Sequence, residues 1–166
     1  MSEAIIIERL DRQMDRVRDH SAQIVNRRVI RGIDASVARC IREGRDAMVR
    51  RLAELDREWD IDRVLMANFA IMGGVAYGVG LDRYSYRPLF GRRRRGWLYF
   101  FGAQLAFLFM HASVGWCPPA VVWRRLGIRT KSEIEVERSL LFTALEPALT
   151  AADALNGPLS VPQAAS

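Results

Sequence analysis

VLMANFAIMGGVAYGVGL, residues 64–81, and WLYFFGAQLAFLFMHASVGW, residues 97–116, are the two stretches that decide the fold. Neither contains Asp, Glu, Lys or Arg. As helices rising about 1.5 Å per residue they would extend about 27 and about 30 Å, close to the roughly 30 Å hydrocarbon core of a bilayer. In a chain of 166 residues, too little other surface remains to cover two helices that are apolar all round. The two stretches therefore predict a helical hairpin in a membrane.

The charges are segregated around these stretches. Residues 1–63 hold 14 arginines against 13 acids, whereas the loop 82–96, DRYSYRPLFGRRRRG, holds six arginines against one acid. This loop supplies nearly all of the net charge of +6. A pI of about 10.1 is also typical of nucleic-acid binding, for which RRRR would be the site. Because the block lies between two uncharged stretches, membrane topology accounts for it better, and we predict no nucleic-acid partner.

The N-terminal part, residues 1–63, is expected to form a soluble helical hairpin. Apolar residues three and four apart predict an amphipathic helix over 3–29. Gly32 is expected to end this pattern, and Asp34 to cap a second helix over about 35–62, whose pattern Gly44 interrupts. The opening residues, MSEAIIIERLDRQMDR, are not typical of an export signal, which favours a cytoplasmic location for this part.

The C-terminal part begins after the second apolar stretch. Ser132 and Glu135 have the spacing of a capping box, which predicts an amphipathic helix within 124–146. Residues 147–166 are rich in Ala, Pro, Gly and Ser, which predicts a disordered tail. The expected fold class is therefore all-α: an N-terminal amphipathic hairpin, a two-span membrane hairpin over 64–123, and a short C-terminal helix.

A few polar and small residues within the spans predict helix packing. Gln104, His111 and Gly115 share one face of the second span, and Asn68 is the polar group of the first. We expect Asn68, Gln104 and His111 to share hydrogen bonds across the hairpin. Gly74 and Gly78 form a GxxxG step, which favours close packing against the second span or against another copy of the chain.

Cys117 is followed by Pro118 and Pro119, which are expected to stop the second membrane helix. Cys117 is either a structural residue at the interface or a reactive thiol, whose pKa nearby arginines could lower. No histidine is spaced to serve as its base, and Cys40 and Cys117 form no metal or redox motif. We predict no metal and no cofactor, and no catalytic constellation points to an enzyme.

The segment GWCPPAVVWRRLGIRTKSEIEVER, residues 115–138, is preceded by RLAELDREWDIDRVL, residues 51–65. Together with the glycine-rich span, they resemble the bacterial YgaP-like transmembrane-domain family over about residues 50–138. The matching positions are Cys117, Pro118, Leu126 and Gly127. The resemblance implies a small two-helix membrane module of unknown function, which in some members is attached to a sulfur-carrying rhodanese domain. In this chain the N-terminal helical hairpin takes the place of that domain.

These observations predict a protein of the bacterial inner membrane with both termini in the cytoplasm. The flanks 49–63 and 124–138 hold nine basic residues against six in the loop, which favours this topology, although RRRR argues for the opposite one. The expected role is structural, or an assembly module that contacts lipid and either a second copy or another membrane protein. The alternative is a thiol function, in which Cys117 relays sulfur or senses oxidants.

Overall fold

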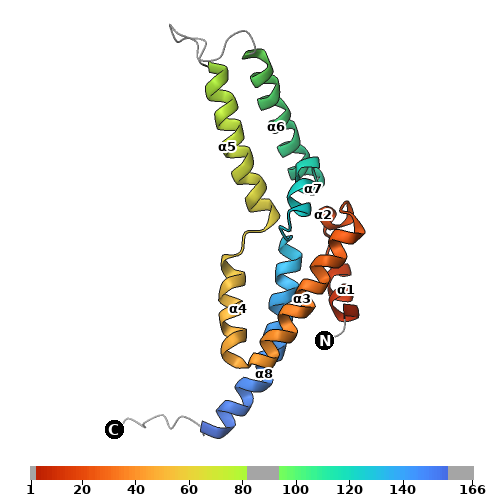
Figure 1. The fold of residues 1–166 in the computed structure, drawn as a ribbon, viewed down its shortest axis with the longest axis vertical. Coiled ribbons are helices and arrows are strands. Elements are labelled where there is room, and N and C mark those ends of the chain that lie inside the picture. Colours follow the sequence, from red (N-terminus) through yellow and green to blue (C-terminus); the bar gives the residue numbers. More distant parts are fainter. Residues whose placement is uncertain (1–2, 82–93, 157–166) are drawn as a thin grey trace, which may run out of the picture.

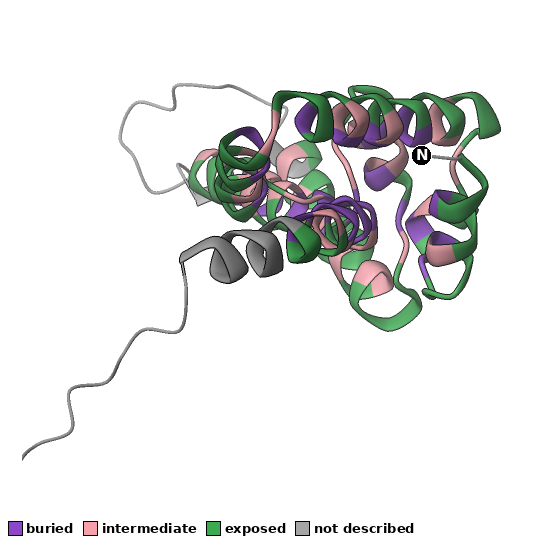
Figure 2. Cartoon of the chain, turned by 90° about the horizontal axis from the view of Figure 1, so that it is seen from below, coloured by how far each residue is buried: buried purple, intermediate pink, exposed green. Residues whose placement is uncertain are grey.

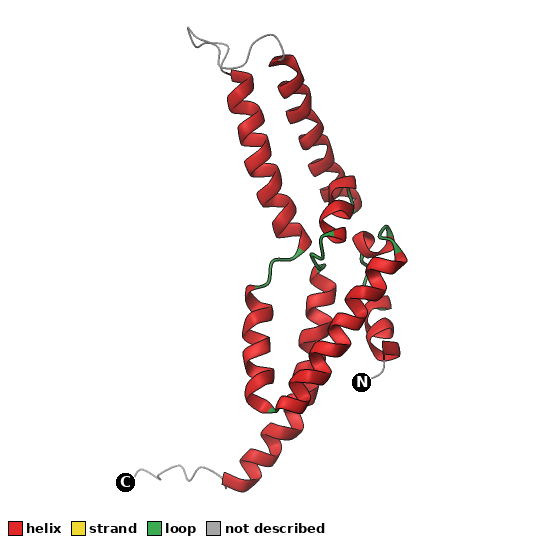
Figure 3. Ribbon diagram, in the orientation of Figure 1, coloured by secondary structure: helices red, strands yellow, loops and turns green. Residues whose placement is uncertain are grey.

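The computed structural model describes residues 3–81 and 94–156, and every regular element within them is a helix (Figure 1; Figure 3). The predicted all-α class is confirmed. The loop residues 82–93 and the tail residues 157–166 lie outside the described part of the chain. The helices are α1 Glu3–Asp11, α2 Arg16–Asp19, α3 Gln23–Glu43, α4 Arg45–Arg57, α5 Ile61–Leu81, α6 Arg94–Val114, α7 Pro118–Arg125 and α8 Lys131–Asn156.

The helices α5 and α6 lie side by side and extend together away from the other helices (Figure 1). Leu65, Phe69 and Ala76 of α5 are buried, and Gly73 brings its backbone close to the ring of Phe101. Among the described residues, one helical stretch, Gly96–Val114, is long and apolar enough to cross a membrane, judged by length and composition alone. Its mean hydropathy is 1.3, and only 6% of this apolar window is buried.

The helices α1, α3, α4 and α8 form a bundle at the other end of the molecule (Figure 1). Their buried residues lie on the faces that meet inside the bundle (Figure 2). This core includes Leu10 of α1, Val37 of α3, Leu55 of α4 and Leu141 of α8, each no more than 2% exposed. Burying one such side chain contributes about 1.5–3 kcal/mol, so the bundle has a core of its own.

The single helix predicted over residues 3–29 is wrong, because this segment forms α1, the short α2 and the start of α3. The carboxylate of Asp15 accepts a hydrogen bond from the N–H of Arg18 at 2.9 Å and caps α2. The predicted apolar stripe does not form a seam, since Met14 is 88% exposed and Ile24 is 69% exposed. Local capping and the packing of α1 on α3 therefore override the periodicity.

The hairpin turn predicted at Gly32 lies instead at Gly44. Helix α3 continues through Gly32 and Asp34, so Asp34 lies inside the helix and not at the start of a new one. A glycine inside a helix costs about 1 kcal/mol, and burial of Ile33 and Val37, which follow Gly32 in the helix, outweighs that cost. Gly44 has φ +91°, a conformation that favours glycine, and its N–H bonds to the carbonyl of Cys40 at 3.0 Å.

The prolines after Cys117 do not stop the apolar helix; they begin the next one. Helix α6 ends at Val114, and Gly115 directly after it has φ +75° and donates its N–H to the carbonyl of His111 at 2.8 Å. Pro118 and Pro119 occupy the first turn of α7, where a missing N–H donor costs nothing. Cys117 precedes them in the extended conformation expected of a residue before proline.

Helix α8 is capped two residues earlier than predicted and runs further. Thr130 and Glu133 form the reciprocal pair: the N–H of Thr130 donates to the carboxylate of Glu133 at 3.0 Å, and the N–H of Glu133 donates to the hydroxyl of Thr130 at 3.4 Å. The predicted box of Ser132 and Glu135 is therefore wrong. The helix also continues through Pro147 to Asn156, into the segment predicted as a tail.

Candidate functional site

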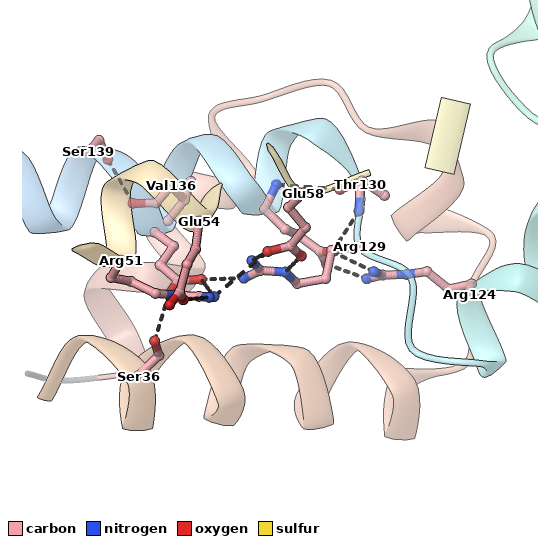
Figure 4. Close-up of polar contacts among 11 residues, drawn as sticks. Ser36, Arg51, Glu54, Glu58, Arg124, Arg129, Thr130, Val136 and Ser139 are labelled. Carbon is pink, nitrogen blue, oxygen red and sulfur yellow. Dashed lines mark hydrogen bonds and ion pairs between the residues drawn. The ribbon is translucent and has the colours of Figure 1, made fainter. Parts of the chain in front are cut away.

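A network of buried ion pairs lies where the α5–α6 hairpin joins the bundle (Figure 4). Its centre is formed by two glutamates of α8, Glu133 and Glu137, which are both 0% exposed. Four residues apart, they lie on the same face of the helix. A carboxylate that is fully removed from water needs cationic and hydrogen-bonding partners, so the surroundings of these two groups decide how the junction is built.

Glu133 pairs with Arg124 of α7, whose side chain is also 0% exposed. Both terminal nitrogens of the guanidinium donate to the carboxylate, which makes the pair bidentate. Arg124 Nη2 also donates to Asn26 Oδ1 of α3 at 3.1 Å. One buried arginine therefore connects α7, α8 and α3.

Glu137 is held by two arginines and a serine. Arg51 Nε of α4 lies 2.8 Å from Glu137 Oε1, and the hydroxyl of Ser36 on α3 donates to the same oxygen at 2.7 Å. Arg129 donates to the other carboxylate oxygen. Arg129 also makes a bidentate pair with Glu58, at 2.7 Å from Nε and 2.6 Å from Nη2. Arg51 in turn reaches Glu54 at 3.0 Å.

Glu137 and Arg51 keep their charges at neutral pH. Burial by itself raises the pKa of Glu137, but the hydrogen bond from Arg51 and the charge of Arg129 outweigh it, so the pKa lies below its ordinary value. The hydrogen bond to Glu137 raises the pKa of Arg51, which stays protonated. Glu137 and Arg51 therefore keep their charges near neutral pH, and their ion pair connects α8 to α4.

The network connects the two chain segments that enter and leave the hairpin. Glu58 lies just before α5, and Arg124 and Arg129 follow α6. The backbone N–H of Ile61 donates to the carbonyl of Arg129 at 3.0 Å, which ties the two segments directly. Any rotation of the hairpin relative to the bundle would have to break these contacts.

The polar residues predicted to share hydrogen bonds in the spans do not do so among the described side chains. His111 Nε2 lies 3.0 Å from Asp62 Oδ1, at the start of α5. Gln104 is buried beside the apolar side chains of the α5–α6 interface, and no hydrogen bond joins it to Asn68 or His111. Asp62 was missed because it is one of several alternating acids over 56–62, and the sequence does not show which of them faces α6.

The predicted glycine step does not face the second span. Gly74 and Gly78 are exposed, and a side chain at either position would meet no atom within 4 Å. The contact with α6 uses Gly73, where an added Cβ would lie 3.5 Å from the ring of Phe101. Gly115, predicted to share the packing face of His111, faces α2 instead: an added Cβ there would lie 3.4 Å from Cγ of Arg16.

Cys117 lies in a small apolar cluster at the base of the hairpin. It is 0% exposed and packs with Ile61 and Leu65 of α5. Burial raises the pKa of the Cys117 thiol, which lowers the fraction of the nucleophilic thiolate. The other cysteine, Cys40, is also buried. In the described part of the chain, no group of three or more His, Cys, Asp or Glu is arranged to hold a metal ion.

No known protein family matches this chain, and no curated protein or solved structure matches it either. The resemblance of residues 50–138 to the YgaP-like transmembrane-domain family is therefore untested and stays a prediction. The role of the chain has to follow from its own residues.

Proposed function

We propose that this chain is an integral protein of the bacterial inner membrane, in which α5 and α6 span the bilayer and the helical bundle lies in the cytoplasm. Its role is that of a structural or assembly module. The observation that carries the proposal is the exposed apolar surface of the two helices. Seven apolar side chains of α6 are more than a third exposed: Leu98, Tyr99, Phe100, Leu105, Phe107, Phe109 and Val114.

Lipid explains this surface better than a protein partner in water does. Exposed apolar patches beyond a few hundred Å² are rare on soluble monomers. On α5, Met66 and Ile71 are also about 65% exposed, so the apolar surface extends over both helices. A soluble partner would cover one face, whereas hydrocarbon covers every outward face of a hairpin. A helix in the core of a soluble protein would instead be mostly buried.

The ion-pair network gives the anchor a defined relation to the bundle. Glu58 and Arg129 tie together the two segments that leave the bilayer, and Glu133 and Glu137 hold both to α8. A module of this kind presents its cytoplasmic surface in a fixed orientation. Gly74 and Gly78, open on the outer face of α5, supply the place where a second copy or another membrane helix packs closely.

A thiol relay through Cys117 has less support. A sulfur-accepting cysteine needs an approach for its donor and a thiolate at neutral pH. Cys117 is fully buried beneath α5 and α7, and its pKa is raised. Replacing Cys117 with serine is therefore expected to change packing at this point and to leave no separate thiol phenotype.

Alkaline carbonate extraction and maleimide labelling test the proposal together. Both native cysteines are buried, so a reporter cysteine at Ser85 in the loop, or at the exposed Arg42 near the end of α3, is labelled selectively. We expect the protein to stay in the membrane pellet, Ser85→Cys to react in intact spheroplasts, and Arg42→Cys to react only after lysis. Release by carbonate contradicts the anchor. The reverse labelling pattern contradicts the topology.

A further inference from the structure

The most exposed apolar side chains outside the hairpin lie at one end of the bundle. They are Met14 at 88%, Leu126 at 70%, Ile24 at 69% and Val122 at 58%. They come from three separate segments: the turn before α2, the first turn of α3, and α7 with the residue after it. Side chains this exposed contribute little to the core of the bundle and are available for another contact.

This end of the bundle is the end next to the hairpin (Figure 1). An added Cβ on Gly115, the residue directly after α6, would lie 3.4 Å from Cγ of Arg16 on α2. The rings of His20 and Trp116 stack with centroids 4.6 Å apart. Asn26 of α3 accepts a hydrogen bond from Arg124 of α7. With α6 in the bilayer, α2 and the start of α3 therefore lie at the depth of the lipid headgroups.

The same end carries an excess of positive charge. Residues 12–28 and 118–131 together hold nine basic residues and two acids. Four of the nine are in ion pairs with acids outside these ranges: Arg12, Arg18, Arg124 and Arg129. Five exposed basic residues remain against the two acids: Arg16, Arg27, Arg28, Arg125 and Lys131. The distal part of the bundle, residues 32–57, holds six basic residues and five acids and is nearly balanced. The charge is thus concentrated where apolar side chains are exposed. Basic residues next to an anionic leaflet contribute about 1 kcal/mol each, and their effect fades within a Debye length of about 8–10 Å.

At Ile24, an exposed apolar side chain lies beside several arginines. A hollow of about 460 Å³ beside it is lined by the side chains of Arg27, Arg28 and Arg31. Most of this lining is apolar. An arginine side chain has an apolar stem that covers apolar surface and a charged head that stays in water. An arginine stem against lipid with its head at a phosphate is the usual arrangement of such side chains at a membrane surface.

We propose that this surface, formed by Met14, Ile24, Val122 and Leu126 with the arginines around them, binds the anionic phospholipid headgroups of the cytoplasmic leaflet. We call it the headgroup face. The proposal rests on the membrane anchor proposed above and adds a second contact to it. The apolar side chains enter the interface, and the guanidinium groups bind lipid phosphates. In this arrangement the bundle contacts the bilayer surface directly, in addition to its covalent link to the membrane hairpin.

The test uses an environment-sensitive fluorophore on the full chain in lipid nanodiscs. The dye is attached at Met14→Cys or Ile24→Cys, and at Ile41→Cys as the matched control, since Ile41 is exposed at the distal end of the same helix. Nanodiscs contain either phosphatidylcholine alone or phosphatidylcholine with phosphatidylglycerol. We expect a blue shift at positions 14 and 24 that requires phosphatidylglycerol and weakens in high salt, with no shift at 41.

Charge variants complete the test. Arg27→Gln with Arg28→Gln is expected to lower the docking equilibrium about 30-fold, from about 1 kcal/mol for each cation. Arg42→Gln with Arg45→Gln removes the same charge at the distal turn and is expected to leave the docking equilibrium unchanged. Equal emission at positions 24 and 41, or equal emission in both lipids, overturns the headgroup face. Because the protein is incorporated into nanodiscs in every case, such a result leaves the anchor standing; release by carbonate would instead refute the anchor.

Discussion

Removing Arg124 should destabilise the protein more than removing any exposed arginine. In Arg124→Met, the fully buried carboxylate of Glu133 keeps the N–H of Thr130 as its one remaining donor in the described part of the chain. Leaving one partner of a buried ion pair alone costs about 3–5 kcal/mol. For a chain of this size, each kcal/mol lowers the unfolding midpoint by about 2–4 °C, so we expect a fall of about 6–20 °C.

The double variant separates the charge from the packing. Arg124→Met with Glu133→Met replaces the pair by apolar side chains of similar length, and such replacements of buried pairs are often neutral or stabilising. We therefore expect the double variant to be more stable than either single one. Its residual cost comes from Asn26, which loses the donor at 3.1 Å.

Thermal unfolding followed by circular dichroism in a mild detergent measures these effects. Arg125→Met, at the exposed neighbour of Arg124, is the matched control and should change the stability by no more than about 0.5 kcal/mol. If the double variant is as unstable as the two single variants added together, then Arg124 and Glu133 do not interact as the structure has them. The buried network would then be refuted at its centre.

Three further predictions concern pH, the glycines and the thiol. Because the pKa of Glu137 is lowered on folding, its charge stabilises the protein above about pH 4.3, the ordinary value for Glu. This contribution is lost as the pH falls below that value. In thermal melts between pH 5 and pH 3, Glu137→Gln should therefore lose less stability than the wild type. Gly73→Leu should disrupt the α5–α6 contact and lower the melting midpoint, whereas Gly74→Leu should leave the midpoint unchanged and weaken self-association in chemical crosslinking; equal midpoints would contradict the interface. Cys117 should react with maleimide only after denaturation, and fast labelling of the native protein would show that it is accessible.

The helices themselves follow from local properties of the chain. The two uncharged stretches predict α5 and α6 because an apolar run of this length has few stable alternatives to a helix. The residues at which the helices begin and end were harder to predict. Gly32 and Gly44 look alike in the sequence, and only the burial of Ile33 and Val37 shows that the chain gains more by continuing the helix through Gly32.

The polar sites depended on the arrangement of distant segments. The run SEIEVER shows three glutamates at alternating positions, yet Glu133 and Glu137 are fully buried while Glu135 is exposed. The partners of Glu137, Ser36 and Arg51, are 101 and 86 residues away in the chain. No local pattern encodes which of many arginines will reach a given carboxylate, because that choice depends on how the helices pack.

The sequence by itself therefore determined that the chain is helical, where its apolar runs lie and how its charges are distributed. These depend on the side-chain chemistry and backbone preferences of neighbouring residues. Tertiary structure decided which carboxylates are buried, which glycines touch another helix, and that Cys117 is shielded. It also brought α2, the start of α3 and α7 to one end of the bundle. Each of these features is a contact between segments far apart in the chain, and such contacts exist only once the helices have packed.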